Sequence, residues 1–223
     1  MEHQIDLVDI HELMAHEDGL LLYKGAEGVI VRRPNGTVMS DILDGEVLCA
    51  HLKELALPDL EQCAVKSRSA VEALQRHFGF TGENPCTQWE YCSEQPPARQ
   101  ALDIRPLTEE YAQIAAEHYH LVDDSTAYVR WRIAEGRMWG LFENGALAGF
   151  IGMHSEGSMG MLEIFPEYRR KGYGYQLEAF LIEWHLRRGR RPYCHVVDGN
   201  DASVHLQTKL GLTKGTLPVI WVY

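Results

Sequence analysis

The sequence predicts an α/β protein in which a mixed, mostly antiparallel sheet is flanked by helices, preceded by a shortened version of the same arrangement. Three observations predict this class: an internal repeat, an ordered alternation of strand and helix patterns, and a glycine-containing turn between a strand and a long helix. The chain has 223 residues, of which 45% are hydrophobic and 24% are charged. This length is sufficient for one large domain or two small ones with a core of their own.

The repeat joins residues 70–91 to residues 202–223 without a gap, at a constant offset of 132. Seven of the 22 aligned positions are identical, and both Trp89/Trp221 and Gly79/Gly211 are among them. A repeat of this length is typical of a duplicated domain. Two unrelated helix–glycine–strand segments are the alternative interpretation.

The predicted join lies in the polar, Pro-Pro-containing segment 96–101. Residues 1–95 then form a degenerate N-terminal domain, and residues 102–223 form the second domain. In the first domain, residues 20–91 are expected to contain three strands, a helix, a strand, a helix and a strand.

The second domain has the order β-α-α-β-β-β-α-β-α-β. Strand patterns cover LDIRPL, the two halves of MWGLFENGALAGFIGMH around an Asn-Gly turn, MGMLEIF, YCHVV and LPVIWVY. Helical patterns cover residues 109–120, 125–136 and 172–188. A further helix is capped by Asn200 or Asp201 and ends at Gly211.

Composition and charge exclude several classes of function. A formal net charge of −11 disfavours nucleic acid as a partner. No apolar run is long enough to span a membrane, and the acidic start does not resemble a signal peptide, so a cytoplasmic protein is expected. Five scattered cysteines without a CxxC pair, and a spacing of five between His11 and His16, predict neither a disulfide framework nor a metal site.

The stretch IFPEYRRKGYG combines a strand end, a basic turn and two glycines before the helix 172–188. The first turn of a helix has unpaired N–H groups and a partial positive charge, and glycine lets an anion approach them. Arg169, Arg170 and Lys171 add full charges. This order predicts a phosphate-binding turn, with an ordinary turn and a solvated basic surface as the alternative.

The same stretch resembles the acyl-CoA binding motif of the GNAT acyltransferase superfamily, [Q/R]-x-x-G-x-[G/A], with Arg169, Gly172 and Gly174 in the fixed positions. Asn200, Ser203 and the KLGL segment match a second feature of that superfamily. Within it, PEYR and PYCHV are similar to glycine N-acyltransferases, which are tandem GNAT proteins.

The resemblance implies an N-acyltransferase that uses acetyl-CoA or another acyl-CoA, with direct attack of an amine on the thioester. It implies that the turn holds the CoA pyrophosphate and that the strand ending in LEIF pairs with the pantetheine arm and polarises the thioester oxygen. The implied cofactor-binding residues are Leu162, Ile164, Phe165, Arg169, Arg170, Lys171, Gly172, Tyr173, Gly174, Asn200 and Ser203.

The general base departs from the pattern of these relatives, which have a glutamate where this chain has Ser158. Glu156 and Glu163 are the nearest carboxylates, and His154 is a further candidate. In a regular strand Glu163 faces away from Ser158, but a bulge would reverse this. Gln207 replaces a tyrosine acid of many relatives. The predicted catalytic residues are Glu163, Glu156 and Ser158, of which serine is a poor base. The alternatives are that a water chain or bulk solvent takes the proton, or that another carboxylate does.

The acceptor is expected to be a small-molecule or amino-acid amine. Residues 119–128 are the segment expected to face it, and Asp123 and Asp124 are the predicted contacts within that segment. A helix-capping loop is the alternative for this pair. The first half carries MSDILDGEVLCAHL instead of the CoA motif, so one CoA site is expected.

The sequence leaves a monomer or a homodimer open, and the strand VIWVY is expected to pair within the duplicated sheet or across a dimer. Two other functions also remain: a non-catalytic acyl-CoA-binding module, and acyl transfer from charged tRNA, which the net charge disfavours.

Overall fold

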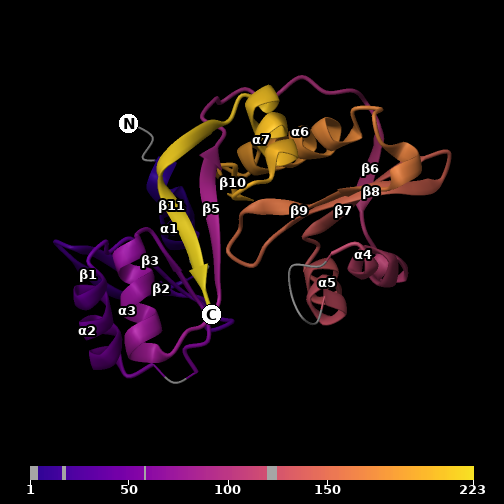
Figure 1. Cartoon of the computed structure of the whole chain (residues 1–223). Coiled ribbons are helices and arrows are strands. Elements are labelled where there is room, and N and C mark those ends of the chain that lie inside the picture. The colour runs from indigo at the N-terminus through magenta and orange to yellow at the C-terminus, as the bar shows by residue number, and fades with distance from the viewer. Residues whose placement is uncertain (1–4, 17–18, 58, 120–124) are drawn as a thin grey trace. The chain divides into compact units, whose positions relative to one another are not determined.

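A computed structural model describes residues 5–16, 19–57, 59–119 and 125–223 (Figure 1). The chain forms two compact units. The first contains residues 1–90, 195–207 and 212–223, and the second contains residues 91–194 and 208–211. β10 (Tyr193–Val197) and α7 (Asp201–Leu210) contribute residues to both units. The join predicted at residues 96–101 stays a prediction.

The first unit is built on strands in the order β1-β2-β3-β4-β11-β5. Its elements are η1 (Ile5–Leu7), α1 (Val8–Ala15), β1 (Leu20–Gly25), β2 (Gly28–Arg32), β3 (Val38–Ser40), α2 (Gly45–Leu55), β4 (Cys63–Val65), α3 (Arg68–Phe78), β5 (Glu83–Glu90) and β11 (Thr213–Val222). From β1 to β5, this order agrees with the elements predicted for residues 20–91.

Helices cover both faces of this sheet. α2 and α3 place Leu48 and Leu74 against Ile30, whereas α1 packs Ile10 against Val31. Because side chains alternate along a strand, the neighbours Ile30 and Val31 face opposite helix layers. The two apolar clusters hold the first unit together from both sides.

The repeated segments fold alike and pair with each other. α3 and α7 each end at a glycine in the left-handed region, Gly79 with φ 77° and Gly211 with φ 84°. The strands that follow, β5 and β11, run antiparallel, and β11 also pairs with β4. The C-terminal strand therefore pairs within the duplicated sheet, which was one of the two predicted arrangements.

The helices η1 and α1 were not among the predicted elements. Asp6 of η1 accepts hydrogen bonds from the N–H groups of Thr216 (2.6 Å) and Leu217 (2.8 Å). These N–H groups lie at the register shift of β11 between Lys214 and Pro218. The N-terminal segment thus satisfies backbone donors that the strand ladder leaves open.

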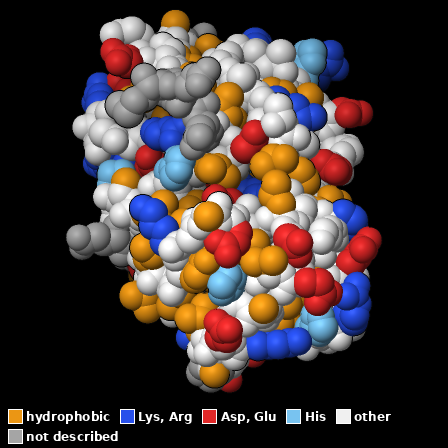
Figure 2. Space-filling view, turned by 90° about the vertical axis from the view of Figure 1, so that its left-hand side faces the viewer, with side chains coloured by type: hydrophobic (Ala, Val, Ile, Leu, Met, Phe, Trp, Pro, Cys, Tyr) orange, Lys and Arg blue, Asp and Glu red, His pale blue; other side chains and the backbone are white. Residues whose placement is uncertain are grey.

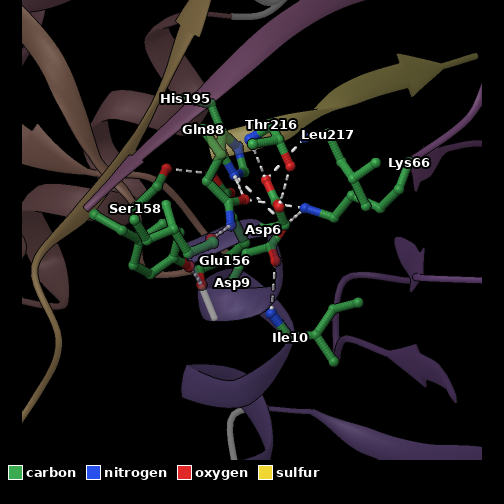
Figure 3. A network of polar contacts seen from close by, with 12 residues as sticks. Asp6, Asp9, Ile10, Lys66, Gln88, Glu156, Ser158, His195, Thr216 and Leu217 are labelled. Atoms are coloured by element: carbon green, nitrogen blue, oxygen red, sulfur yellow. Dashed lines mark hydrogen bonds and ion pairs between the residues drawn. The ribbon is translucent and has the colours of Figure 1, made fainter. Parts of the chain in front are cut away.

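A buried polar network fixes α1 to the sheet (Figure 3). Asp9 Oδ2 lies 2.6 Å from Lys66 Nζ, which also donates to Gln88 Oε1 at 3.0 Å. His195 Nε2 lies 3.0 Å from the same Gln88 oxygen and 3.6 Å from Asp9 Oδ2. Burial alone would raise the pKa of Asp9, but Lys66 and His195 hold it well below its usual range.

The second unit contains the strands β6, β7, β8 and β9 in this order, with β9 beside β10. Its elements are β6 (Asp103–Pro106), η2 (Glu109–Tyr111), α4 (Ala112–Glu117), α5 (Ser125–Ala134), β7 (Met138–Glu143), β8 (Ala146–Met153), β9 (Met159–Ile164), η3 (Pro166–Tyr168) and α6 (Tyr173–Leu186). The order from β6 to β11 is the predicted one, although the helix predicted over 109–120 consists of a 3₁₀ turn and the shorter α4.

The sheet of the second unit also separates two helix layers. Ala115 of α4 and Val129 of α5 pack in one cluster with Phe150 of β8. On the α6 side, the Trp139 ring of β7 contacts the Trp184 ring at 5.3 Å between centroids. The predicted Asn-Gly turn joins β7 to β8, with both of its residues in the left-handed region.

The described surface carries charges of both signs. Figure 2 shows acidic and basic side chains interspersed on one face of the described residues. No helix in the described part of the chain is both long and apolar enough to cross a bilayer. All five cysteines are free thiols.

Candidate active site

The glycine turn leaves the N-terminus of α6 open. Gly172 precedes the helix with φ 79° and ψ 11°, and no side-chain cap at this N-cap position is found among the described residues. A Cβ at Gly172 would meet nothing within 4 Å among the described residues, so the left-handed backbone, and not crowding, requires glycine here. A left-handed residue before a helical one directs successive N–H groups to one side, a geometry that binds anions.

The three basic residues of the turn differ in their partners. Arg169 donates to the Ile164 carbonyl (2.9 Å) and to Glu163 Oε1 (3.0 Å). Lys171 forms an ion pair with Glu143 of β7 at 2.7 Å. Arg170 makes no ion pair with a described residue, and its φ of 66° is left-handed. A non-glycine residue in this region costs about 1 kcal/mol or more, and such strain is concentrated at functional sites.

The strand before the turn carries the expected bulge. Phe150 of β8 pairs with Glu163 and Gly152 pairs with Gly160, so Met161 and Leu162 together oppose one residue of β8. Met161 has φ 51°, which accounts for the extra residue. Because directly paired residues share a face, Glu163 lies on the same face as Gly160, and therefore as Ser158. The bulge thus reverses the parity of a regular strand.

Glu156 and Ser158 lie together at the beginning of this strand (Figure 3). The Ser158 hydroxyl donates to Glu156 Oε1 at 2.5 Å, and both side chains are buried. Arg132 of α5 braces the preceding loop, since its guanidinium donates to the carbonyls of Met153 (2.8 Å) and His154 (3.2 Å). The loop therefore holds the buried Glu156 carboxylate next to β9, with the Ser158 hydroxyl between them.

Two tyrosines accompany this carboxylate. The rings of Tyr119 and Tyr128 stack with centroids 5.7 Å apart, and Tyr119 Oη lies 3.5 Å from His154 Nδ1. Burial, and then the charge of Glu156, raise the pKa of Tyr128 to about 12. Burial, and then the neighbouring Tyr128 and Glu156, raise the pKa of Tyr119 further. Both hydroxyls are therefore neutral at physiological pH. Both tyrosines lie at the ends of residues 119–128, the segment expected to face the acceptor, but neither was predicted individually as a site residue.

The other predicted site residues lie in several places. Leu162 is in the bulge, Ile164 accepts the Arg169 hydrogen bond, and the buried Phe165 ring contacts His118. Asn200 Oδ1 accepts from the Ser203 N–H at 3.1 Å and caps α7, as expected. Asp123 and Asp124 lie outside the described residues.

Gln207, which stands where many relatives have a tyrosine acid, is buried. Within the described part of the chain, no three His, Cys, Asp or Glu side chains are arranged to hold a metal ion.

The first unit contains an equivalent helix whose N-terminus is already occupied. Asp44 Oδ1 accepts hydrogen bonds from the N–H groups of Glu46 (2.9 Å) and Val47 (3.2 Å) at the beginning of α2. This carboxylate takes the place that a phosphate would need. The cap supports the expectation of a single CoA site in the C-terminal half.

We expect Asp44→Ala to lower the free energy of unfolding by about 1 kcal/mol, because two backbone donors lose their acceptor. Ser67→Ala is the matched control, since Ser67 caps α3 through the Ala70 N–H. Urea denaturation measures the stability, and calorimetric titration should give one acetyl-CoA per chain in all three proteins. A second equivalent bound by the wild type, with Asp44 in place, would contradict the assignment of this helix.

Comparison with known proteins decides the family. The family model described as acetyltransferase (GNAT) family matches residues 101–212, which is half of the chain. The chain belongs to the GNAT acetyltransferase family. Its fold, with a bulged strand, a glycine turn and an uncapped helix, is therefore that of an N-acetyltransferase, and the family's cosubstrate is acetyl-CoA.

Solved structures share this fold. A Drosophila protein is 19% identical, with a TM-score of 0.66 over 87% of this chain and 73% of that chain. A Novosphingobium aromaticivorans protein assigned to the GNAT family is 18% identical, with a TM-score of 0.62 over 99% and 97%. A tandem GNAT protein from the clavulanic acid biosynthesis pathway is 16% identical, with a TM-score of 0.51 over 97% and 87%. No curated protein matches the chain.

Proposed function

We propose that this GNAT protein transfers an acetyl or other short acyl group from acyl-CoA to the primary amine of a small molecule or amino acid. The observation that carries the proposal is the uncapped, glycine-led N-terminus of α6 directly after a bulged strand. These two features supply the parts that a thioester substrate needs: an anion site for its phosphates and backbone groups for its amide-rich arm.

The CoA pyrophosphate would bind the N–H groups at Gly172, Tyr173 and Gly174. Arg170, which makes no ion pair with a described residue, would be the cation beside them. In the described residues, the ladder between β9 and β10 consists of the pair Cys194–Met159. Beyond Met159, the edge of β9 that does not pair with β8 is the proposed site of the pantetheine arm. The Leu162 N–H in the bulge is the proposed donor to the thioester oxygen, worth about 3 kcal/mol in the transition state. Asn200 and Ser203 stay predicted contributors.

Glu156 is the proposed proton acceptor, acting through Ser158. As the amine nitrogen bonds to the thioester carbon, its proton passes to Ser158 Oγ, and the Ser158 proton passes to Glu156 Oε1. The C–S bond then breaks, the CoA thiolate takes a proton from solvent, and Glu156 releases the proton it received to solvent, which restores the carboxylate. Glu163 already forms an ion pair with Arg169, which suits it better to positioning the turn.

Two motifs and the charge of the chain support the proposed acceptor class. The segments PEYR and PYCHV support an amino-acid acceptor of the kind used by glycine N-acyltransferases. The acidic chain favours the approach of cationic amines. Asp123 and Asp124 stay predicted contacts for an ammonium group.

The deciding experiment measures product formation from acetyl-, propionyl- and benzoyl-CoA with amino acids, polyamines and short peptides. Mass spectrometry should read the products, because five free thiols would react with a thiol dye. Turnover with an amine is expected and would identify the acceptor. Binding of acetyl-CoA without turnover on any amine would favour a non-catalytic acyl-CoA-binding module instead.

Gly172→Glu should weaken acetyl-CoA binding at least about tenfold, because it strains the turn and places a negative charge at the helix N-terminus. Gly189→Glu is the matched control. Gly189 has φ 67°, also has nothing within 4 Å of an added Cβ, and lies beyond the opposite end of α6. Both variants should lose similar thermal stability, while only Gly172→Glu loses affinity in calorimetry. Equal affinities would place the phosphates elsewhere.

A further inference from the structure

Glu143, at the end of β7, binds the residues on both sides of Gly172. Its two carboxylate oxygens lie 3.0 Å and 2.7 Å from Lys171 Nζ. The Tyr173 hydroxyl donates a hydrogen bond to Glu143 Oε1 as well. One carboxylate from a different strand therefore occupies the polar groups that flank the open helix end.

The contact changes the electrostatics of the turn. Hydrogen bonding to Glu143 raises the pKa of Lys171 and that of Tyr173, and both partners lower the pKa of Glu143. Glu143 and Lys171 are thus both ionised at neutral pH and cancel each other. With Arg169 paired to Glu163, the basic triplet presents one unpaired cation, Arg170, among the described residues.

We propose that Glu143 competes with the CoA phosphates for Lys171 and the N-terminus of α6. This competition lowers the affinity of the protein for acyl-CoA and for the product CoA alike. A phosphate at the N-terminus of α6 would be repelled by the nearby Glu143 carboxylate. Lys171 could bind this phosphate only after it leaves Glu143. The contact is solvent-exposed, so its strength depends on ionic strength. Weak binding of both CoA forms shortens the residence of the product and suits repeated turnover. This inference rests on the proposed site at Gly172.

Glu143→Gln should bind acetyl-CoA and CoA about tenfold more tightly than the wild type at low salt, because one nearby negative charge is removed. The gain should shrink toward twofold at about 0.5 M NaCl, where exposed charges are screened. Glu167→Gln is the matched control, since Glu167 is an exposed residue of η3 that carries the same charge and makes no ion pair with a described residue. Its affinity should stay within twofold of the wild type.

A double-mutant cycle separates competition from general repulsion. Lys171→Met should weaken binding only slightly in the wild type, where Glu143 engages Lys171, but about tenfold beside Glu143→Gln, where Lys171 is released. Equal or weaker acetyl-CoA binding by Glu143→Gln would overturn the inference and make Glu143 a support for Lys171. Failure of the wild type to bind acetyl-CoA at all would instead overturn the proposed function.

Discussion

Glu156→Gln is expected to lower kcat by about a hundredfold or more, because a positioned general base contributes that much to a proton transfer. The glutamine keeps the size of the side chain and an oxygen that accepts the Ser158 hydrogen bond, so the β8–β9 loop should keep its structure. The proposed CoA groups lie in the bulge and the turn, and hence KM for acetyl-CoA should change less than threefold. Steady-state kinetics with the acceptor found in the screen measures both constants.

Three further variants test whether the loss of kcat is specific to Glu156. Ser158→Ala should lower kcat by a smaller factor, because a water molecule can replace the hydroxyl. Glu163→Gln should mainly raise KM, since Arg169 loses its partner. Glu117→Gln changes an exposed carboxylate of α4 and should behave as the wild type. The assignment fails if Glu163→Gln loses kcat while Glu156→Gln retains it.

Asp9→Asn is expected to destabilise the protein by about 3–5 kcal/mol, because it leaves the Lys66 ammonium buried without a counterion. Lys66 is 2% exposed and Asp9 is fully buried, so water cannot replace the lost partner. Urea denaturation measures the change. Trp221, whose ring lies 5.9 Å from that of His195, is the intrinsic fluorescent reporter of this region.

The control for this prediction is an exposed ion pair. Glu83→Gln breaks the contact with Arg68, whose side chain is 54% exposed, and should cost less than about 1 kcal/mol. Adding Lys66→Met to Asp9→Asn should restore part of the loss, since no unpaired charge is then buried. Equal effects of Asp9→Asn and Glu83→Gln would show that the network does not hold α1.

The same network makes the free energy of unfolding decrease as the pH is lowered. The pKa of Asp9 is lower in the folded chain than in the unfolded chain, so the ionised carboxylate stabilises the fold above the unfolded value of about 4. This contribution is lost as the pH falls from there toward the lower folded pKa. The urea denaturation midpoint of the wild type should therefore fall as the pH is lowered below about 4. The same fall should be shallower in Asp9→Asn.

The elements that sequence predicted best are those with local signals. Asn144-Gly145 specifies its own turn, and Gly79 and Gly211 end their helices through left-handed backbone. α1 was not predicted because Asp9 and Glu12 occupy buried positions. The sequence of this helix therefore lacks the usual separation of an apolar face from a polar face. Charged residues at inward positions are informative only when their partner is known, and Lys66 lies far away in the sequence.

The site was predictable to a similar extent. The strand end, the basic turn and the glycines before α6 are consecutive in the sequence, so the turn could be located without a structure. The hydrogen bond between Glu156 and Ser158 depends on loop conformation, and the Glu143–Lys171 pair depends on the contact between β7 and the turn before α6. The bulge was expected, but Met161 as its left-handed residue was not.

The position of β11 between β4 and β5 affects how the protein is made. Both neighbours leave the ribosome long before residues 213–222 are synthesised, so the first unit cannot close its sheet during most of translation. Until then, the facing edges of β4 and β5 are open to incorrect strands or to chaperones. Loss of residues 213–222 would consequently leave the sheet of the first unit open between β4 and β5.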